Sequence, residues 1–385
     1  MTIADDQSIA TPAAQPRTAT RQHRAQAGRN PKARMANAVA PSTARTESEV
    51  DDLLDQSRAV VTPELRAAVD ALPQGIGQVV KYHFGWMDQD GRSLDGDGSW
   101  GKGLRSALAL ACAEAVGGHA SAALPAAVAL QVMHEASLLH DDVFDEDRLR
   151  RHRETVCAAY STPTAVLAGN ALFFASIQAL LRGAPRHTVD AIAALTAAGQ
   201  RLNEGERADI SFETRRDVTV TECLDMMADK TAALIECACV LGARYGSATS
   251  ERINALGRFG HHLGMGFQAI DDDLGIFGDP QVTGKPAGED LRRRKRTLLV
   301  VRALHTQTPA AAALAAIYDG EGPLTDTEVH EAAELIDATG ARQWVRDYAR
   351  QQIDAALEQL TRAQPTTHGA ELLTALAALV VDRNI

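Results

Sequence analysis

The stretch His134-Glu-Ala-Ser-Leu-Leu-His-Asp-Asp-Val-Phe-Asp-Glu-Asp147 carries the strongest structural signal in this chain of 385 residues. On an α-helix, Asp141 and Asp145 lie one turn apart on the same face. Ser137 and His134 lie on that face one turn and two turns earlier. The stretch therefore predicts a helix with a polar stripe that ends in carboxylates.

Carboxylates gather at the end of this stretch although they disfavour its helix. Like charges four residues apart cost about 0.2–0.5 kcal/mol per pair, and Asp is a mediocre helix former. A cation is therefore expected to compensate Asp141, Asp142, Asp145 and Asp147. Carboxylate oxygens without a His or Cys partner suit Mg²⁺, which binds through one or two carboxylates, waters and substrate phosphates. A solvated acidic surface is the alternative interpretation of this cluster taken alone.

A second acidic cluster lies further along the chain. The stretch Phe267-Gln-Ala-Ile-Asp-Asp-Asp273 follows an apolar helical segment and precedes Gly278-Asp-Pro-Gln-Val-Thr-Gly-Lys-Pro-Ala-Gly-Glu-Asp-Leu291. Two carboxylate sites that face one cavity could hold several metal ions around one diphosphate. The two clusters together therefore predict a metal-dependent diphosphate site.

Basic residues near these clusters are candidates for binding the diphosphate. The chain has six lysines against 33 arginines, and four of the lysines stand beside Gly, Thr or Arg in motif-like settings: Lys102, Lys230, Lys285 and Lys295. Lys offers phosphate a compact point charge, whereas Arg offers a planar fork. Arg150 and Arg151 follow the first acidic cluster. Solvated surface lysines, and an arginine pair at a helix C-terminus, are the alternatives.

Composition favours an all-α fold. Apolar residues make up 45% of the chain and aromatic residues 4%, Ala and Leu recur throughout, and runs of β-branched residues are few. Gly and Pro interrupt the helical pattern at Gly117-Gly118, Gly183-Ala-Pro185, Gly278-Asp-Pro280 and residues 320–323. Thr325-Asp-Thr-Glu328 is a capping box that opens a helix, and residues 363–369 precede the last one. One large helical domain is predicted from residue 56 to residue 385.

Charge and cysteine content exclude several classes of protein. The formal net charge of −11 argues against a general nucleic-acid-binding protein, which neutralises phosphates with Lys and Arg. The five cysteines contain no C-x-x-C, so neither a disulfide framework nor a zinc site is indicated, and a cytoplasmic location is expected. No run reaches the roughly 20 apolar residues of a membrane span, and the N-terminus lacks the pattern of a secretory signal.

Residues 1–55 differ from the rest of the chain. Ala, Thr, Pro, Gln and Arg alternate there without apolar periodicity, and Leu first occurs at Leu53. Seven basic and two acidic residues give residues 1–45 a charge of +5, which leaves −16 elsewhere. This composition predicts a disordered tail. A docking tag for a protein partner or shell is the more specific alternative, and Asp5 and Asp6 argue against an organellar transit peptide.

The two acidic motifs and the Lys-Thr pair between them resemble the trans-isoprenyl diphosphate synthases, the polyprenyl synthetase family, of the type that makes geranylgeranyl or longer polyprenyl diphosphates. The resemblance covers residues 60–385. It implies an all-α bundle of the isoprenoid synthase type with a central cavity, and a homodimer. It also implies Mg²⁺ as cofactor, with isopentenyl diphosphate and an allylic prenyl diphosphate as substrates.

Carried over by position, the resemblance implies a role for each motif residue. The magnesium ligands, which with Lys230 form the catalytic set, would be Asp141, Asp142, Asp145, Asp271 and Asp272. Isopentenyl diphosphate would be bound by Lys102, Arg105, His134 and Arg151. The allylic diphosphate would be held by Arg150, Lys230, Gln268 and Lys285, together with Thr231 and Lys295.

Some positions depart from the family's pattern. Gly275 stands where the second motif usually has its last aspartate, with Asp273 as the candidate replacement, and Glu206 stands where Gln is usual. The other departures are Ser106 for Pro, Asn170 for Asp and Glu154 for Pro. Related bacterial sequences also have Leu-Gly-Ile-aromatic-Gly-Asp after the second motif, so Gly275 alone does not indicate a loss of activity.

The implied reaction is a head-to-tail condensation. Magnesium and the cationic side chains would stabilise the charge that develops on the departing diphosphate. The double bond of isopentenyl diphosphate would then attack the allylic cation in a cavity that excludes water. Ala136 and Ser137, about one turn before Asp141, would line the path of the growing chain. Because both are small, geranylgeranyl diphosphate or a longer product is expected. Close helix packing is the alternative reason for their size.

Two other functions stay open at this point. A class I terpene cyclase uses similar carboxylates but needs no second diphosphate site, and Lys102, Arg105 and Arg151 argue against it. A non-catalytic subunit, or a cargo protein docked through residues 1–55, is suggested by the departures from the motifs and by the tail.

Overall fold

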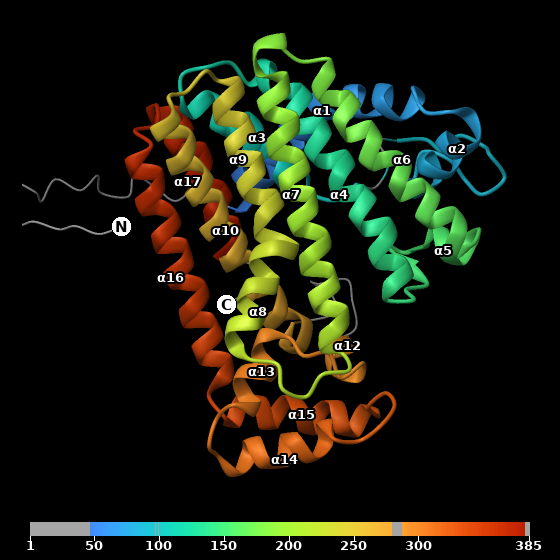
Figure 1. Ribbon diagram of the computed structural model, residues 1–385, viewed down its shortest axis with the longest axis vertical. Coiled ribbons are helices and arrows are strands. Elements are labelled where there is room, and N and C mark those ends of the chain that lie inside the picture. The colour runs from blue at the N-terminus through green and yellow to red at the C-terminus, as the bar shows by residue number, and fades with distance from the viewer. Residues whose placement is uncertain (1–46, 97, 99, 279–286, 382–385) are drawn as a thin grey trace, which may run out of the picture. The chain divides into compact units, whose positions relative to one another are not determined.

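Long helices dominate the computed structural model, which describes residues 47–96, 98, 100–278 and 287–381 (Figure 1). The elements in chain order are α1 (Glu47–Asp70), α2 (Gln74–His83), α3 (Leu104–Ala115), η2 (Ala120–Ala123), α4 (Leu124–Phe144), β1 (Leu149–Arg150), β2 (Arg153–Glu154), α5 (Val156–Ala159), α6 (Thr162–Leu181), α7 (Pro185–Phe212), α8 (Val220–Met227), η3 (Ala228–Ala232), α9 (Ala233–Tyr245), α10 (Ser250–Phe277), α12 (Glu289–Arg292), α13 (Leu298–Leu304), α14 (Pro309–Tyr318), α15 (Asp326–Ala338), α16 (Ala341–Arg362) and α17 (Thr367–Val381). The predicted all-α fold is confirmed. In the described part of the chain, the hairpin of β1 and β2 is the one sheet.

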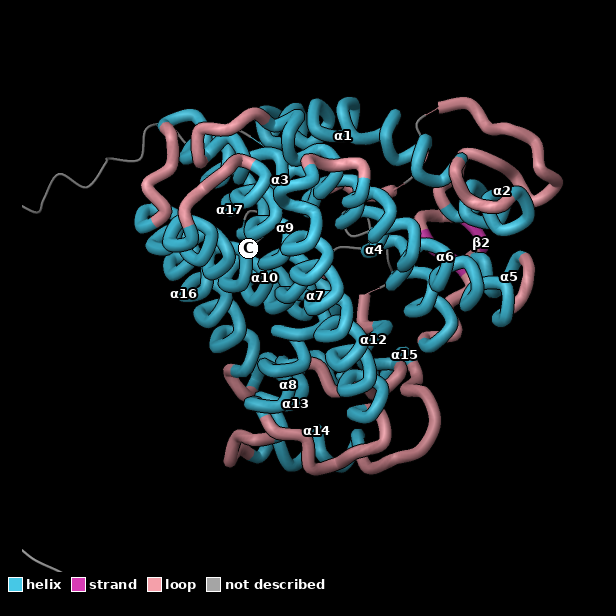
Figure 2. Tube along the Cα trace, turned by 45° about the horizontal axis from the view of Figure 1, so that its top comes forward, coloured by secondary structure: helices cyan, strands magenta, loops and turns pink. Residues whose placement is uncertain are grey.

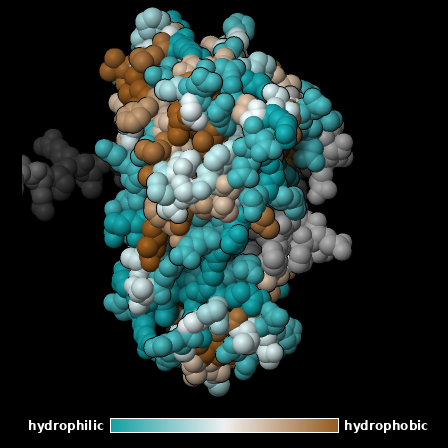
Figure 3. Space-filling view, turned by 90° about the vertical axis from the view of Figure 1, so that its right-hand side faces the viewer, coloured by the Kyte–Doolittle hydropathy of each residue, from teal (hydrophilic) through white to brown (hydrophobic). Residues whose placement is uncertain are grey.

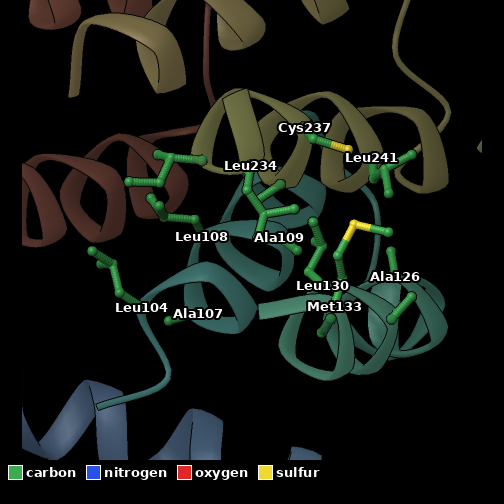
Figure 4. Packing of buried hydrophobic residues seen from close by; sticks show 14 of the residues in the cluster. Leu104, Ala107, Leu108, Ala109, Ala126, Leu130, Met133, Leu234, Cys237 and Leu241 are labelled. Atoms are coloured by element: carbon green, nitrogen blue, oxygen red, sulfur yellow. The ribbon is translucent and has the colours of Figure 1, made fainter. Parts of the chain in front are cut away.

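Apolar faces of α3, α4 and α9 pack together in the middle of the fold (Figure 4). Leu108 of α3, Leu130 of α4 and Leu241 of α9 are fully buried. Burial of each such side chain contributes about 1.5–3 kcal/mol. Gly242 lets α9 approach α3, because a Cβ at this position would collide with the backbone carbonyl of Ala109. The helices that surround the expected site are therefore held rigidly against one another.

The long helix α10 takes part in two apolar clusters. Its first half, with Phe259 and Leu263, packs in the cluster that contains α3 and α9. Its second half, with Ile270 and Ile276, packs with α8 and α13 to α15, which lie at the lower end of the helices in Figure 1. On α7, Glu206 and Asp209 stand between Leu202 of the first cluster and Phe212 of the second. A charged site is thus enclosed by apolar packing on both sides.

Several predicted helix boundaries agree with the structure, but the break predicted at residues 363–369 is too long, because α17 already begins at Thr367. Helix α3 ends before Gly117-Gly118, and α7 begins at Pro185. The predicted capping box opens α15: the backbone N–H of Glu328 donates to Thr325 Oγ1, and the backbone N–H of Thr325 donates to the Glu328 carboxylate. The hairpin was not predicted, and it is seen in Figure 2 as the magenta strand near α5 and α6.

The predicted end of the tail at residue 55 is also wrong. Helix α1 already begins at Glu47. Val50 and Leu54 lie one helical turn apart, and their side chains are buried against the rest of the fold. Residues 1–46, which hold the remainder of the predicted tail, lie outside the described residues.

Among the described residues, two segments are long and apolar enough, by length and composition alone, to cross a membrane, namely residues Ala120–Phe144 and α6. The expectation that no stretch reaches this length is therefore wrong, because scattered polar residues do not prevent a high mean hydropathy. The first segment is 72% buried within the protein, as expected of a core helix, whereas α6 is only 44% buried. Helix α6 therefore presents apolar side chains outward.

Candidate active site

Asp141 and Asp142 lie at the end of α4 and point in different directions, because successive helical residues are about 100° apart. Asp142 is fully buried and accepts a hydrogen bond of 2.5 Å from Arg150 Nε. Burial raises the pKa of Asp142, and the charge of Arg150 opposes the rise. In the described part of the chain, its Oδ2 atom has no hydrogen-bond partner. Asp142 therefore belongs to the side of the site that faces the hairpin.

Asp141 lies on the side that faces α7 and η3. Burial raises its pKa, against the opposing charge of Lys230, and its carboxyl group shares a hydrogen bond with Glu206. Burial, followed by the charge of Asp141, raises the pKa of Glu206 to about 7. Lys230 Nζ lies 2.6 Å from Glu206 and 2.7 Å from Asp209. Burial of the two carboxyl groups thus outweighs the charge of Lys230 and favours their neutral forms.

Two further cations connect the first acidic motif with the chain that follows the second. Lys295 Nζ lies 2.9 Å from Asp209 and 3.9 Å from Asp145. Arg293 donates hydrogen bonds of 2.6 Å to Asp147 Oδ1 and 2.8 Å to the backbone carbonyl of Asp145. The segment after α12 is thereby attached to the end of α4.

Lys230 and Thr231 lie in η3, a single π-helical turn between α8 and α9. Such turns interrupt a helix locally and occur often at functional sites. Arg201 of α7 holds the turn through a hydrogen bond of 2.7 Å to Asp229. Gly205 of α7 lies so close that a Cβ would collide with the backbone nitrogen of Lys230. The position of Lys230 thus depends on the absence of a side chain at residue 205.

A chain of hydrogen bonds connects η3 with the second acidic motif. Thr231 Oγ1 donates to Gln268 Oε1 at 2.5 Å, and Gln268 Nε2 donates to Asp272 Oδ1 at 2.8 Å. The backbone N–H of Leu298 donates to Asp272 Oδ2 at 3.2 Å. Burial raises the pKa of Asp272 to about 7. Asp272 is therefore fixed in place by neutral donors.

Asp273 does not replace the missing last aspartate of the second motif, and this expectation is wrong. Its two oxygens accept hydrogen bonds of 2.9 Å from Arg342 and 2.8 Å from Arg346, because it lies on the face of α10 that packs against α16. Asp290 lies closer to Gly275, the position where the motif usually has its last aspartate. Its Oδ2 atom is 2.9 Å from the position of a Cβ on Gly275. Asp290 thus brings a carboxylate to the place of the missing side chain.

Arg150 and Arg151 lie in the hairpin and not at a helix C-terminus. Arg150 pairs with Arg153, which leaves Arg151 and His152 as the two residues of the turn. Their φ angles are 51° and 62°. Positive φ at both positions is typical of a type I′ turn, which favours Asn-Gly. A non-glycine residue in this region costs about 1–3 kcal/mol, so this turn is strained.

We expect His152→Gly to raise the free energy of unfolding by about 0.5–1 kcal/mol, because glycine adopts positive φ without steric strain but loses more entropy on folding. Urea denaturation measures this difference. His119→Gly is the matched control, since His119 is exposed with a φ of −103° and the same substitution should destabilise the protein there. Equal effects at the two positions would show that the turn is not strained.

Arg105 of α3 and His134 of α4 are half-buried. Burial lowers the pKa of Arg105 to about 10, against the opposing charges of Glu135, Asp271 and Asp141. Arg105 thus experiences the negative charge of a carboxylate from each acidic motif. Its Nε atom has no hydrogen-bond partner among the described residues. Burial, and then the charge of Arg105, hold the pKa of His134 well below its ordinary value, so His134 is neutral.

Of the remaining predicted residues, the structure describes Lys102 but not Lys285. Lys102 is exposed in the loop before α3. If Gly101 in the same loop had a Cβ atom, that atom would lie 3.5 Å from the guanidinium group of Arg151. Arg151 thus lies beside the loop that contains Lys102. Lys285 lies outside the described residues. Asp209 was not predicted as a site residue, although its spacing of three from Glu206 on a helix places both on one face.

Residues 98–336 match the family model described as polyprenyl synthetase. The chain belongs to the polyprenyl synthetase family. It is 38% identical over 346 residues to a (2E,6E)-farnesyl diphosphate synthase of Mycobacterium tuberculosis, a match that covers 89% of this chain and 96% of that protein. It is 39% identical over 333 residues to a geranylgeranyl diphosphate synthase of the same organism, with coverage of 86% and 93%.

Solved structures of polyprenyl synthetases have the same fold. The polyprenyl synthetase of Streptomyces coelicolor A3(2) matches with a TM-score of 0.82 and 42% identity, over 86% of this chain and 99% of that chain. The geranylgeranyl pyrophosphate synthase of Corynebacterium glutamicum, complexed with isoprenyl diphosphate and magnesium, matches with a TM-score of 0.75 and 28% identity, over 87% and 99%.

The acidic residues of this polyprenyl synthetase fit a divalent cation whose coordination a substrate completes. Within the described ranges, no three His, Cys, Asp or Glu side chains are grouped so that they could hold an ion by themselves. Mg²⁺ commonly uses one or two carboxylates with waters and phosphate oxygens. The buried Oδ2 atom of Asp142 has no hydrogen-bond partner among the described residues, so it is a carboxylate oxygen that could bind such an ion.

Proposed function

We propose that this chain is a magnesium-dependent prenyltransferase that condenses isopentenyl diphosphate head-to-tail with an allylic diphosphate. The observation that carries the proposal is a chain of contacts between the two motifs. Lys295 lies between Asp145 and Asp209, and Asp209 also pairs with Lys230. Thr231, next to Lys230, reaches Asp272 through Gln268. The two acidic motifs thus belong to one buried centre, and Lys230 supplies positive charge to it. Preorganised charge around a departing diphosphate is what ionisation of an allylic substrate requires.

The side chains fall into three groups, which would bind Mg²⁺, the allylic diphosphate and isopentenyl diphosphate. Asp141, Asp142, Asp145, Asp271 and Asp272 would hold Mg²⁺, which when bound supplies a Lewis acid for the leaving diphosphate. Lys230 and Lys295 would neutralise the allylic diphosphate, with Arg150, Thr231, Gln268 and Lys285 as further contacts. Arg105, Arg151, Lys102 and His134 would bind isopentenyl diphosphate. The apolar clusters on either side would exclude water from the allylic cation, and the expected central cavity stays a prediction.

One assay tests the proposed function. The protein is incubated with Mg²⁺, isopentenyl diphosphate and each allylic primer in turn, with and without a chelator, and the products are sized. We expect geranylgeranyl diphosphate or a longer product that disappears with chelator and returns with added Mg²⁺. Conversion of geranylgeranyl diphosphate alone into a hydrocarbon would instead support a terpene cyclase. A folded protein that is inactive with every primer would support a non-catalytic subunit.

Product length is expected to depend more on Ser137 than on Ala136. On α4, Ser137 lies about 40° from Asp141 around the helix axis, whereas Ala136 lies about 140° away. Ala136 is fully buried. Its carbonyl oxygen lies close to Gly169 of α6, because a Cβ atom added to that glycine would be only 3.2 Å away. We therefore propose that Ser137 borders the path of the growing chain, while Ala136 mainly permits α4 to pack on α6.

We expect Ser137→Phe to shorten the product by about one isoprene unit or more, because the larger side chain fills the path below Asp141. Ala136→Phe should mainly lower stability, and the double variant should shorten the product. Chromatography of the products and thermal unfolding separate the two effects. An unchanged product from Ser137→Phe and from the double variant would place the end of the path elsewhere.

We also propose that the chain forms a homodimer through α6. Leu167, Phe174 and Leu181 of this helix are 60%, 70% and 60% exposed. Figure 3 shows hydrophobic side chains on the side of the molecule where α5 and α6 lie. A second copy would cover this apolar surface. Light scattering should give twice the chain mass of 41.0 kDa, and Leu167→Glu with Phe174→Glu should give the monomer.

The tail and the cellular location remain proposals as well. We propose that residues 1–46 bind a protein partner or shell, so that their deletion leaves catalysis intact and abolishes co-purification with the partner. A cytoplasmic location is supported by the five cysteines, all of which have free thiols.

A further inference from the structure

Glu135 of α4 is a fully buried carboxylate next to the proposed site for isopentenyl diphosphate. Arg151 donates to both of its oxygens, at 3.1 Å to Oε1 and 3.2 Å to Oε2. Gln131 Nε2 donates to Oε1 at 2.8 Å, and His83 Nε2 lies 2.8 Å from Oε2. Both oxygens of the carboxylate are thus satisfied.

The charge state of Glu135 follows from these partners. Burial favours its neutral form, but the charge of Arg151 and the hydrogen bond to His83 outweigh burial and hold its pKa well below the ordinary value. Glu135 is therefore an ionised partner of Arg151. A buried ion pair of this kind loses much of its stability when one partner is removed.

The Glu135 network joins four parts of the fold that are distant in sequence. His83 ends α2, Gln131 and Glu135 lie on α4, and Arg151 lies in the hairpin turn. Gln131 Nε2 also donates at 3.1 Å to the backbone carbonyl of Trp100, just before the loop that contains Lys102. The network therefore sets the hairpin and this loop relative to α4.

Arg151 needs such an anchor because its local sequence does not favour its conformation. Its φ of 51° lies in the left-handed region, which an arginine adopts at a steric cost. The guanidinium group nevertheless has a defined plane, because both terminal nitrogens are bound by one carboxylate. The same group lies beside Gly101.

We propose that Glu135 is a positioning residue that orients Arg151 toward the diphosphate of isopentenyl diphosphate. This inference rests on the proposed function, and it assigns to Glu135 a role that the motif residues do not include. Glu135 acts through Arg151 and makes no contact with substrate itself. Its loss should therefore weaken binding of one substrate only.

The first test is Glu135→Gln in the full chain, which keeps the shape of the side chain and removes its charge. We expect the KM for isopentenyl diphosphate to rise about tenfold or more, with kcat and the KM for the allylic primer changed less than about threefold. Calorimetric titration with isopentenyl diphosphate alone should show the same loss of affinity. A purely structural role would change stability and affect both substrates alike.

The second test is a double-mutant cycle with Arg151→Ala. If Glu135 acts through Arg151, Glu135→Gln should change the KM for isopentenyl diphosphate little once Arg151 is absent. Additive effects of the two substitutions would overturn the inference. Should Glu135→Gln fail to fold, His83→Phe removes one contact of the carboxylate and should raise the same KM to a smaller extent.

These outcomes can be told apart from failure of the proposed function. A wild-type protein that forms no product from isopentenyl diphosphate and any primer overturns the proposed function. An active wild-type protein whose Glu135→Gln variant keeps its KM for isopentenyl diphosphate overturns only the role of Glu135.

Discussion

Asp141→Asn is expected to lower kcat by about 10²–10³-fold, the range seen when one preorganised electrostatic group is removed. Asp141 is half-buried, and the charge of Lys230 and a hydrogen bond with Glu206 act on its carboxyl group. The substitution removes a carboxylate that we propose as a metal ligand, so the Mg²⁺ concentration needed for half-maximal activity should also rise. Steady-state rates measured across a magnesium titration test both effects.

Asp273→Asn is the matched control, because the same substitution is made in a motif aspartate that faces away from the site. Asp273 is paired with Arg342 and Arg346. We expect kcat to change less than about threefold. The free energy of unfolding should fall by about 2 kcal/mol, since the carboxylate is buried while both arginines are partly exposed. If Asp273→Asn abolishes turnover and Asp141→Asn does not, the assignment of the metal ligands is wrong.

Gly205→Ala should have a comparable effect on turnover without changing any charged residue. The added methyl group would collide with the backbone of η3 at Lys230, and α7 cannot yield easily because Arg201 ties it to the same turn. A displacement of about 1 Å in a group that acts on the reaction costs about 10²-fold. We expect a loss of this size in kcat, measured with saturating substrates.

Gly199→Ala provides the control on the same helix. Its Cβ would lie 3.3 Å from Cε of Met133, the end of a flexible side chain that can move aside. We expect kcat to stay within about threefold of the wild type. Comparable losses at residues 199 and 205 would indicate a general defect in α7 and not a displacement of Lys230.

Motifs that depend on local spacing were predictable because a helix places residues three and four apart on one face. The end of α4 with Asp141 and Asp145 and the capping box at Thr325 are of this kind. The hairpin was not predictable in this way. Positive φ at Arg151 and His152 contradicts their local preference, and contacts such as that between Arg151 and Glu135 hold the turn.

Helical spacing also could not predict which of two neighbouring carboxylates faces the site. Asp271 and Asp273 stand two residues apart in one acidic run, yet the charge of Asp271 acts on Arg105, whereas Asp273 pairs with arginines of α16. Asp290 of α12, fifteen positions from Gly275 in the sequence, lies beside it in the fold. The direction of each side chain depends on which helix packs against which face.

By itself, the sequence determined the helical fold, the two acidic motifs and the family to which the chain belongs, because periodicity and motif spacing are properties of adjacent turns. Only the tertiary structure decided which carboxylates meet, how Gly205 brings Lys230 to Glu206, and that Glu135 holds Arg151. These pairs join residues from different helices, and their geometry depends on how the apolar faces of those helices pack.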